Sequence, residues 1–153
     1  TTNKDSNYFS LDIYGQIDEK QTEWFVKLKK NFPSYVKYCG IVPFDKSVEV
    51  IKHYFALLFP TLFYTEGIPG TIIDAYAAGV PVISAKWQNF IDVVDDGDTG
   101  IGYEFGNAMD LEDKLKEIES CVDKVNARKI NCLQKSKQFM PQEAMKILIE
   151  ELQ

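Results

Sequence analysis

Residues 56–83 restrict the fold more than any other stretch of this chain, because they combine two apolar runs with a loop rich in glycine and proline. The runs are Ala56–Phe59 and Val80–Ile83, and short apolar runs between turn residues are typical of buried parallel strands. Between them lie a loop at 61–70 and a helical pattern at Thr71–Ala78. The stretch therefore predicts a βαβ unit, in which a ligand binds at the carboxyl ends of the strands.

Two acidic residues of this unit indicate what it binds. Glu66 lies in the loop and Asp74 lies in the first turn of the predicted helix, with seven residues between them. Gly67 and Gly70 leave backbone N–H groups free to face a ligand, and the start of a helix favours anions. Carboxylates accept hydrogen bonds from sugar hydroxyls, whereas amides donate to phosphate. The combination predicts a ligand that carries both hydroxyls and phosphate.

Each acid also has a purely structural interpretation. Thr71-x-x-Asp74 is a variant of the capping box, and for Asp74 alone this interpretation and ligand binding carry equal weight. Glu66 alone fits a solvated loop acid. Neither interpretation requires the glycines and prolines that surround both acids, so the whole string favours a binding site.

The string T-E-G-I-P-G-T-I-I-D-A-Y-A-A-G-V-P-V-I resembles the signature of a large group of glycosyltransferases. These are the retaining, nucleotide-sugar-dependent enzymes of GT-B architecture, family 4 (group 1). Their pattern is an acid, Gly-x-Pro, a second acid, and then Ala-x-Ala-x-Gly-x-Pro-Val-Ile. The family has Glu at the second acid, where this chain has Asp74 with a side chain that is one methylene shorter.

The resemblance implies a role for each matched residue. Glu66 would be the catalytic residue that holds hydroxyls of the transferred sugar, and Asp74 would hold the ribose hydroxyls. The backbone that faces the donor sugar and its diphosphate would be Gly67, Ile68, Pro69, Gly70 and Thr71. Catalysis would consist mainly of positioning the donor and stabilising the departing diphosphate.

A second part of the resemblance concerns the nucleotide base. The predicted strand Ser34–Cys39 is followed by Gly-Ile-Val-Pro, which in the family lies against the base. Gly40, Ile41 and Val42 are therefore the expected base-contact residues. The alternative is that these residues form a plain strand exit.

One segment departs from the family pattern. Where the family has a glycine-rich loop after the second strand, this chain has Lys86-Trp87-Gln88-Asn89. Lys86 either supplies a positive charge to the site or is a solvated surface lysine, and the second interpretation is favoured.

Composition excludes several other classes of function. The chain has 153 residues, enough for one domain, and its net charge of −6 argues against a nucleic-acid partner. It has no run of 18 apolar residues, and no His, Asp or Glu cluster with metal-ligand spacing, so neither a membrane span nor a metal site is expected. The three cysteines form no CxxC pair, which indicates reduced thiols and a cytoplasmic setting.

Strand and helix patterns alternate along the rest of the chain, as expected for an α/β fold. The further strands are predicted at Tyr8–Tyr14, Ser34–Cys39 and Ile101–Phe105, and the further helices at Asp18–Asn31, Asp45–His53, Asn89–Val94, Asn107–Ser120, Val122–Phe139 and Gln142–Leu152.

The predicted fold is thus α/β, a Rossmann-like parallel sheet with helices on both faces. By resemblance it corresponds to the C-terminal half of a GT-B fold without its first strand. Residues 1–153 are expected to form a single nucleotide-sugar-binding domain, a fragment of a longer two-domain chain. The donor would be an NDP-sugar, with UDP-sugar as the first choice over guanine or adenine nucleotides, and no metal or other cofactor is expected.

The resemblance also implies the rest of the reaction. A hexose-type sugar would pass to a glycan or lipid-linked acceptor bound by the missing N-terminal domain, so this chain alone should be inactive. The full-length enzyme would be cytoplasmic, with peripheral association at the inner face of the membrane. Two alternatives stay open: a non-catalytic nucleotide-binding or regulatory module on the same scaffold, and a nucleotide-sugar epimerase of similar fold.

Overall fold

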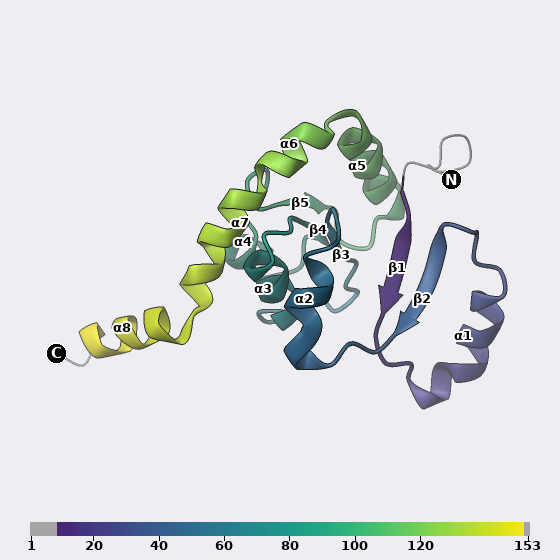
Figure 1. The fold of residues 1–153 in the computed structure, drawn as a ribbon, viewed down its shortest axis with the longest axis horizontal. Coiled ribbons are helices and arrows are strands. Elements are labelled where there is room, and N and C mark those ends of the chain that lie inside the picture. Colours follow the sequence, from purple (N-terminus) through teal and green to yellow (C-terminus); the bar gives the residue numbers. More distant parts are fainter. Residues whose placement is uncertain (1–8, 152–153) are drawn as a thin grey trace. The chain divides into compact units, whose positions relative to one another are not determined.

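The computed structural model describes residues 9–151, and Figure 1 shows the fold. The chain divides into two compact units, with the boundary between Lys46 and Ser47. The predicted strand start at Tyr8 and the predicted helix end at Leu152 lie outside the described residues.

The first unit is built around two parallel strands. β1 (Leu11–Tyr14) pairs with β2 (Val36–Gly40), with Leu11 opposite Val36. Along the chain, a 3₁₀ turn at Glu19–Gln21 and helix α1 (Thr22–Lys29) connect the two strands. The predicted strand–helix–strand order is confirmed, and it makes a second parallel crossover in addition to the one expected from residues 56–83.

The second unit holds a parallel sheet of three strands. In sheet order these are β3 (Leu57–Phe59), β4 (Val82–Ala85) and β5 (Gly100–Tyr103). β4 is buried along its whole length, whereas β3 is half-buried throughout. The prediction that Ala56–Phe59 is a buried strand is therefore wrong. The central position belongs to β4, because β3 pairs along only one side within this sheet.

Seven α-helices accompany the three strands in the described part of the second unit. They are α2 (Ser47–Ile51), α3 (Gly70–Ala77), α4 (Phe90–Val93), α5 (Ala108–Ser120), α6 (Val122–Ala127), α7 (Lys129–Ser136) and α8 (Pro141–Glu151).

The predicted single helix at Val122–Phe139 is divided at Arg128. The N–H of Arg128 donates to the carbonyl of Val125, three residues earlier, at 3.1 Å. This bond is shorter in sequence than the four-residue bond of an α-helix, so it tightens the turn and ends α6. A 3₁₀ turn at Lys137–Phe139 then ends α7. Within residues 9–151, no helix combines the length and the apolar character needed to cross a bilayer.

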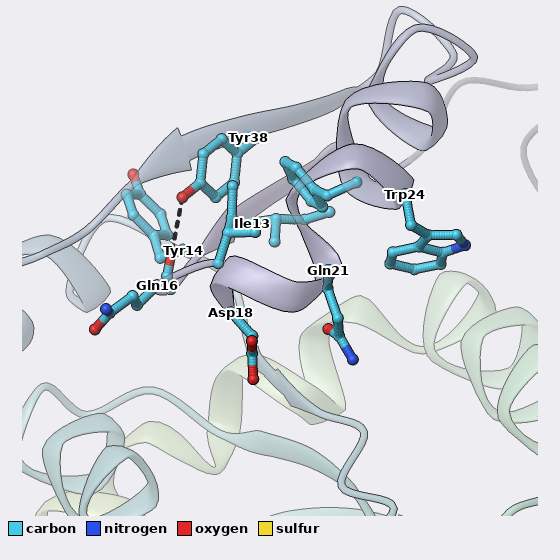
Figure 2. A pocket seen from close by; sticks show the side chains of 10 residues that line it. Ile13, Tyr14, Gln16, Asp18, Gln21, Trp24 and Tyr38 are labelled. Atoms are coloured by element: carbon cyan, nitrogen blue, oxygen red, sulfur yellow. Dashed lines mark hydrogen bonds between the residues drawn. The ribbon is translucent and has the colours of Figure 1, made fainter.

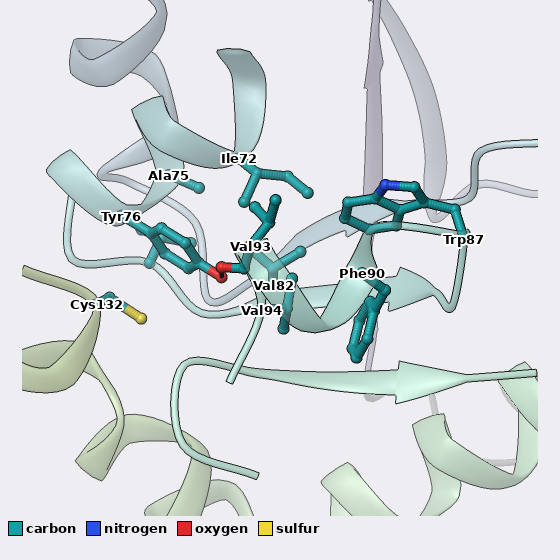
Figure 3. Packing of buried hydrophobic residues seen from close by; sticks show 10 residues of the cluster. Ile72, Ala75, Tyr76, Val82, Trp87, Phe90, Val93, Val94 and Cys132 are labelled. Carbon is teal, nitrogen blue, oxygen red and sulfur yellow. Dashed lines mark hydrogen bonds between the residues drawn. The ribbon is translucent and has the colours of Figure 1, made fainter. Parts of the chain in front are cut away.

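One face of α3 forms the core of the second unit (Figure 3). Ile72, Ala75 and Tyr76 are fully buried against β4, α4 and α7. The Tyr76 hydroxyl donates to the carbonyl of Val93 at 3.1 Å and lies 3.1 Å from the hydroxyl of Thr99. Burial raises the pKa of Tyr76 well above its usual value, so it acts as a neutral hydrogen-bonding group. This packing fixes α3, the helix that carries Asp74, against the sheet.

Gly79 follows the last turn of α3 and ends the helix. Its φ of 68° lies in the left-handed region that favours glycine at a helix C-terminus. The N–H of Gly79 donates to the carbonyl of Tyr76 at 2.9 Å, and the N–H of Val80 donates to the carbonyl of Ala75 at 2.8 Å. The chain thereby turns from α3 directly into the buried strand β4.

Candidate functional site

The loop between β3 and α3 lies at the carboxyl end of β3, where ligands bind in parallel α/β sheets. Pro60 follows the strand, and the Thr61 hydroxyl accepts a hydrogen bond from the N–H of Phe63 at 3.0 Å, which turns the chain. A second turn follows, because the N–H of Glu66 bonds to the carbonyl of Phe63 at 3.2 Å. These two turns place Glu66 in the middle of the loop.

The Glu66 side chain is half-buried. Within residues 9–151 its carboxylate has neither an ion pair nor a hydrogen bond. A carboxylate that is partly withdrawn from water and lacks a protein partner is well suited to accept hydrogen bonds from the hydroxyls of a ligand.

The backbone of the same loop is held by the segment after β4. The N–H of Gln88 donates to the carbonyl of Tyr64 at 2.9 Å, and the side-chain amide of Asn89 donates to the carbonyl of Glu66 at 3.0 Å. The segment that replaces the expected glycine-rich loop therefore fixes the loop that carries Glu66.

Four backbone N–H groups around the start of α3 are unused. Those of Gly67, Ile68, Gly70 and Thr71 have no hydrogen-bond acceptor among the described residues, and Pro69 has no N–H. The glycines also leave space, because a Cβ at Gly67 or Gly70 would meet no atom within 4 Å. The residues expected to face the sugar and diphosphate thus offer donors and room for a ligand.

The expectation that Asp74 lies in the first turn of its helix is wrong. α3 begins at Gly70, and Pro69 is its N-cap, with a carbonyl that accepts from the N–H groups of Ile72 at 3.0 Å and Ile73 at 3.4 Å. Asp74 is therefore in the second turn. The capping-box alternative fails for the same reason, since the start of α3 receives no side-chain hydrogen bond. Instead, the Asp74 carboxylate accepts a hydrogen bond from the hydroxyl of Ser47 in α2.

The residues expected to contact the base belong to the first unit. Gly40 ends β2 with a φ of 86°, and Ile41 is 67% exposed, so its side chain is accessible to a ligand. Val42 is half-buried in the turn that follows. These three residues lie at the carboxyl end of β2, as the prediction requires.

A small pocket of about 150 Å³ lies at the end of β1 in the first unit, with Gly15 and Tyr38 in its lining (Figure 2). The Tyr38 hydroxyl donates to the carbonyl of Gly15 at 2.7 Å, and the N–H of Gly15 donates to the carbonyl of Gly40 at 2.9 Å. Aromatic side chains, among them Trp24 and Phe25, form much of its wall. Its volume is below the roughly 300 Å³ at which ligand pockets begin, so alone it cannot enclose a nucleotide.

Lys86 is a surface lysine, as the favoured interpretation predicts, because its side chain is 48% exposed. Its Nζ forms an ion pair of 2.7 Å with Asp96. Burial alone would raise the pKa of Asp96, but the Lys86 ammonium and the N–H of Gly102 hold it below its usual value. Lys86 therefore ties the end of β4 to the turn before β5.

Three residues at this site had no role in the sequence analysis: Ser47, Asn89 and Trp87. Trp87 is only 3% exposed and packs against Phe59, with ring centroids 5.9 Å apart. Its indole nitrogen is buried and has no hydrogen-bond partner within residues 9–151. In Figure 3 this nitrogen lies on the edge of the indole away from Phe90. Only the unusual Lys-Trp-Gln-Asn string could have drawn attention to this region.

Among the described residues, no group of three or more His, Cys, Asp or Glu side chains is arranged to hold a metal ion.

Comparison with known families gives a match over most of the chain. The family model described as glycosyl transferases group 1 matches residues 2–120. A search of curated proteins finds no match.

Solved structures with the same fold are numerous but distant in sequence. HepE from Anabaena, crystallised with UDP, has a TM-score of 0.77 at 15% identity, covering 93% of this chain and 41% of HepE. Sucrose-phosphate synthase from Thermosynechococcus elongatus has a TM-score of 0.75 at 18% identity, covering 94% of this chain and 37% of the synthase.

A C-terminal domain solved on its own is also similar. This domain, from the group 1 glycosyl transferase LpcC of Francisella tularensis, has a TM-score of 0.75 at 14% identity. The match covers 90% of this chain and 72% of that domain. Together these structures confirm the predicted Rossmann-like half of a GT-B fold, and this chain spans less than half the length of HepE and of the synthase.

Proposed function

Because this chain belongs to the glycosyl transferases group 1 family, we propose that it is the donor-binding part of a retaining hexosyltransferase. The substrate that it binds is a nucleotide sugar, and a second domain of the full-length enzyme binds the acceptor and completes the cleft. The acceptor is a glycan or a lipid-linked sugar.

The observation that carries the proposal is the grouping of unused polar groups on one loop and the start of one helix. The half-buried Glu66 carboxylate has no partner within residues 9–151, and four N–H groups at Gly67–Thr71 have no acceptor there. A diphosphate needs hydrogen-bond donors and a sugar needs acceptors, so the loop offers what a sugar nucleotide requires.

In the proposed reaction the bond between the anomeric carbon and the diphosphate oxygen breaks, a bond to the oxygen of an acceptor hydroxyl forms, and the proton of that hydroxyl passes to the departing diphosphate. Glu66 accepts hydrogen bonds from hydroxyls of the donor sugar and fixes its orientation. The N–H groups of Gly67–Thr71 donate to the diphosphate as its negative charge grows. Asp74 accepts from the ribose hydroxyls, and Gly40, Ile41 and Val42 contact the base.

The choice of UDP as the nucleotide has support from relatives. HepE was crystallised with UDP and with UDP-glucose. The proposal that no metal ion takes part stays separate and is tested by transfer in the presence of EDTA. A cytoplasmic location with peripheral membrane association is likewise a proposal about the full-length enzyme.

A nuclear magnetic resonance titration of this chain with UDP, GDP and ADP tests the proposal. We expect amide shifts at Gly67–Thr71 and Gly40–Val42 with one of the three nucleotides. Glu66→Ala should leave binding of the free nucleotide nearly unchanged and weaken binding of the UDP-sugar, because Glu66 holds the sugar. Absence of shifts with all three nucleotides at millimolar concentration contradicts the proposal.

A second candidate function is a nucleotide-binding module without catalysis. It is favoured by one observation: the Asp74 side chain is one methylene shorter than the family's Glu. Sugar transfer by the full-length protein, with loss on Glu66→Gln, rejects this candidate. Nucleotide binding without any transfer supports it.

A further inference from the structure

Ser47 and Asp74 join two helices that lie far apart in the sequence. Ser47 is the first residue of α2, Asp74 is in the second turn of α3, and 27 positions separate them. The Ser47 hydroxyl bonds to Oδ2 of Asp74. An ionised carboxylate can only accept, so Ser47 is the donor.

The bond leaves most of the carboxylate available. Two carboxylate oxygens offer about four acceptor positions, and Ser47 occupies one of them. Within residues 9–151, Ser47 is the one hydrogen-bond partner of the Asp74 side chain, which is half-buried. Oδ1 therefore keeps its lone pairs for a ligand while Oδ2 is anchored.

We propose that Ser47 is a positioning residue, which orients the Asp74 carboxylate toward the vicinal hydroxyls of a ribose. Ser47 thereby sets the preference of the site for ribonucleotides over 2′-deoxyribonucleotides. The proposal rests on the proposed function, because it assigns Asp74 to the ribose.

The physical reason lies in the torsion that ends the aspartate side chain. Rotation of a carboxylate about χ2 is broad, so an unanchored carboxylate samples many directions. A hydrogen bond from a hydroxyl to a charged oxygen is stronger than one between neutral groups and selects a single direction. The side chain then loses less freedom when a ligand binds, which strengthens binding.

A structural alternative predicts a different result. If the bond only ties α2 to α3, its loss should lower stability and weaken the binding of all nucleotides alike. If Ser47 acts through Asp74, its loss affects only ligands that carry the hydroxyl pair. The 2′-hydroxyl of the nucleotide therefore distinguishes the two roles.

The experiment is calorimetric titration of the chain with UDP and with 2′-deoxy-UDP. We expect Ser47→Ala to weaken UDP binding about three- to tenfold and to leave 2′-deoxy-UDP binding unchanged. Ser47→Thr keeps the hydroxyl and should restore UDP binding. In an Asp74→Ala background, Ser47→Ala should have no further effect, because the two residues act as one unit.

The matched control is Ser120→Ala, which removes an exposed serine hydroxyl from α5. Thermal unfolding of each variant confirms that the fold is intact. Equal weakening of both nucleotides by Ser47→Ala, or weakening of neither while the wild type binds UDP, overturns the role of Ser47 and leaves the donor site standing. If the wild type binds none of UDP, GDP and ADP, the proposed donor site is contradicted, and so is the proposed role of Ser47.

Discussion

The side-chain amide of Asn89 donates a hydrogen bond of 3.0 Å to the backbone carbonyl of Glu66. The bond connects the segment after β4 with the loop after β3, so the carboxyl ends of two neighbouring strands are tied together. A backbone bond from Gln88 to Tyr64, 2.9 Å long, lies beside it. A loop held at two points keeps the groups that we propose to bind the donor in place before the donor arrives.

We predict that Asn89→Ala lowers the affinity for the UDP-sugar clearly but lowers the free energy of unfolding only slightly. The loss of one half-buried hydrogen bond should lower the free energy of unfolding by only about 1 kcal/mol. Binding of the UDP-sugar should fall about tenfold, because a misplaced binding loop has a large effect. Gln88→Ala is the matched control, since the Gln88 bond uses its backbone N–H. Equal binding by the two variants would contradict the prediction.

Gly70 and Gly100 should respond in opposite ways to replacement by alanine. A Cβ at Gly70 meets open space, and alanine is favoured over glycine in a helix, so Gly70→Ala should raise stability by up to about 1 kcal/mol. A Cβ at Gly100 would lie 2.6 Å from the carbonyl oxygen of Val82, so Gly100→Ala should lower stability by about 1–3 kcal/mol. Chemical denaturation measures both.

The same Gly70→Ala variant tests the donor site. Its methyl group would occupy space at the start of α3, where the diphosphate is proposed to lie. We therefore expect weaker UDP binding in a protein that is at least as stable as the wild type. Unchanged UDP affinity in Gly70→Ala would place the diphosphate elsewhere.

Trp87 carries a buried N–H group without a partner, so two substitutions should differ sharply. Trp87→Phe removes the unpaired donor and keeps most of the ring, and we expect stability to change by less than about 1.5 kcal/mol. Trp87→Ala leaves a cavity next to Phe59 and Phe90, and should lower stability by about 3–5 kcal/mol. A large loss in Trp87→Phe would mean that the indole nitrogen has a partner in solution.

The buried thiol of Cys132 should make the free energy of unfolding depend on pH in the alkaline range. Burial raises the pKa of its thiol from 9.0 to about 11. As the pH rises above 9, the unfolded state loses this proton before the folded state does, so stability falls between pH 9 and about 11. Cys132→Ala removes this contribution. We expect the free energy of unfolding to fall less steeply from pH 8 to pH 10 in the variant than in the wild type. Parallel profiles would contradict the prediction.

Local sequence signals predicted local structure well. Asn107 begins α5 as expected, with its side chain accepting from the N–H groups of Met109 and Asp110 at 3.0 and 3.1 Å. Gly79 ends α3, and the βαβ order of residues 56–83 is confirmed. The two helix ends depend on residues within one turn of each other, and the βαβ order follows from the order of apolar runs and turn residues along the chain, so the sequence alone contains the information.

The contacts that shape the site depend on residues far apart in the chain. Asn89 reaches Glu66 across 23 positions, and Ser47 reaches Asp74 across 27. No spacing rule links such pairs, because packing brings them together. The same reason explains the error about β3: whether a strand is buried depends on its neighbours in the sheet, which its own four apolar residues do not specify.

Helix α3 has a consequence for engineering. Its residues Ile72, Ala75 and Tyr76 are fully buried, and they determine the rotation of the helix about its axis. Successive residues of a helix differ by about 100° in direction, so that rotation also sets where Asp74 points. Substitutions in the core, at Ile72 or Tyr76, should therefore alter which nucleotides are accepted, although neither residue touches a ligand. A selection for changed donor preference should vary this hidden side of the helix together with the exposed one.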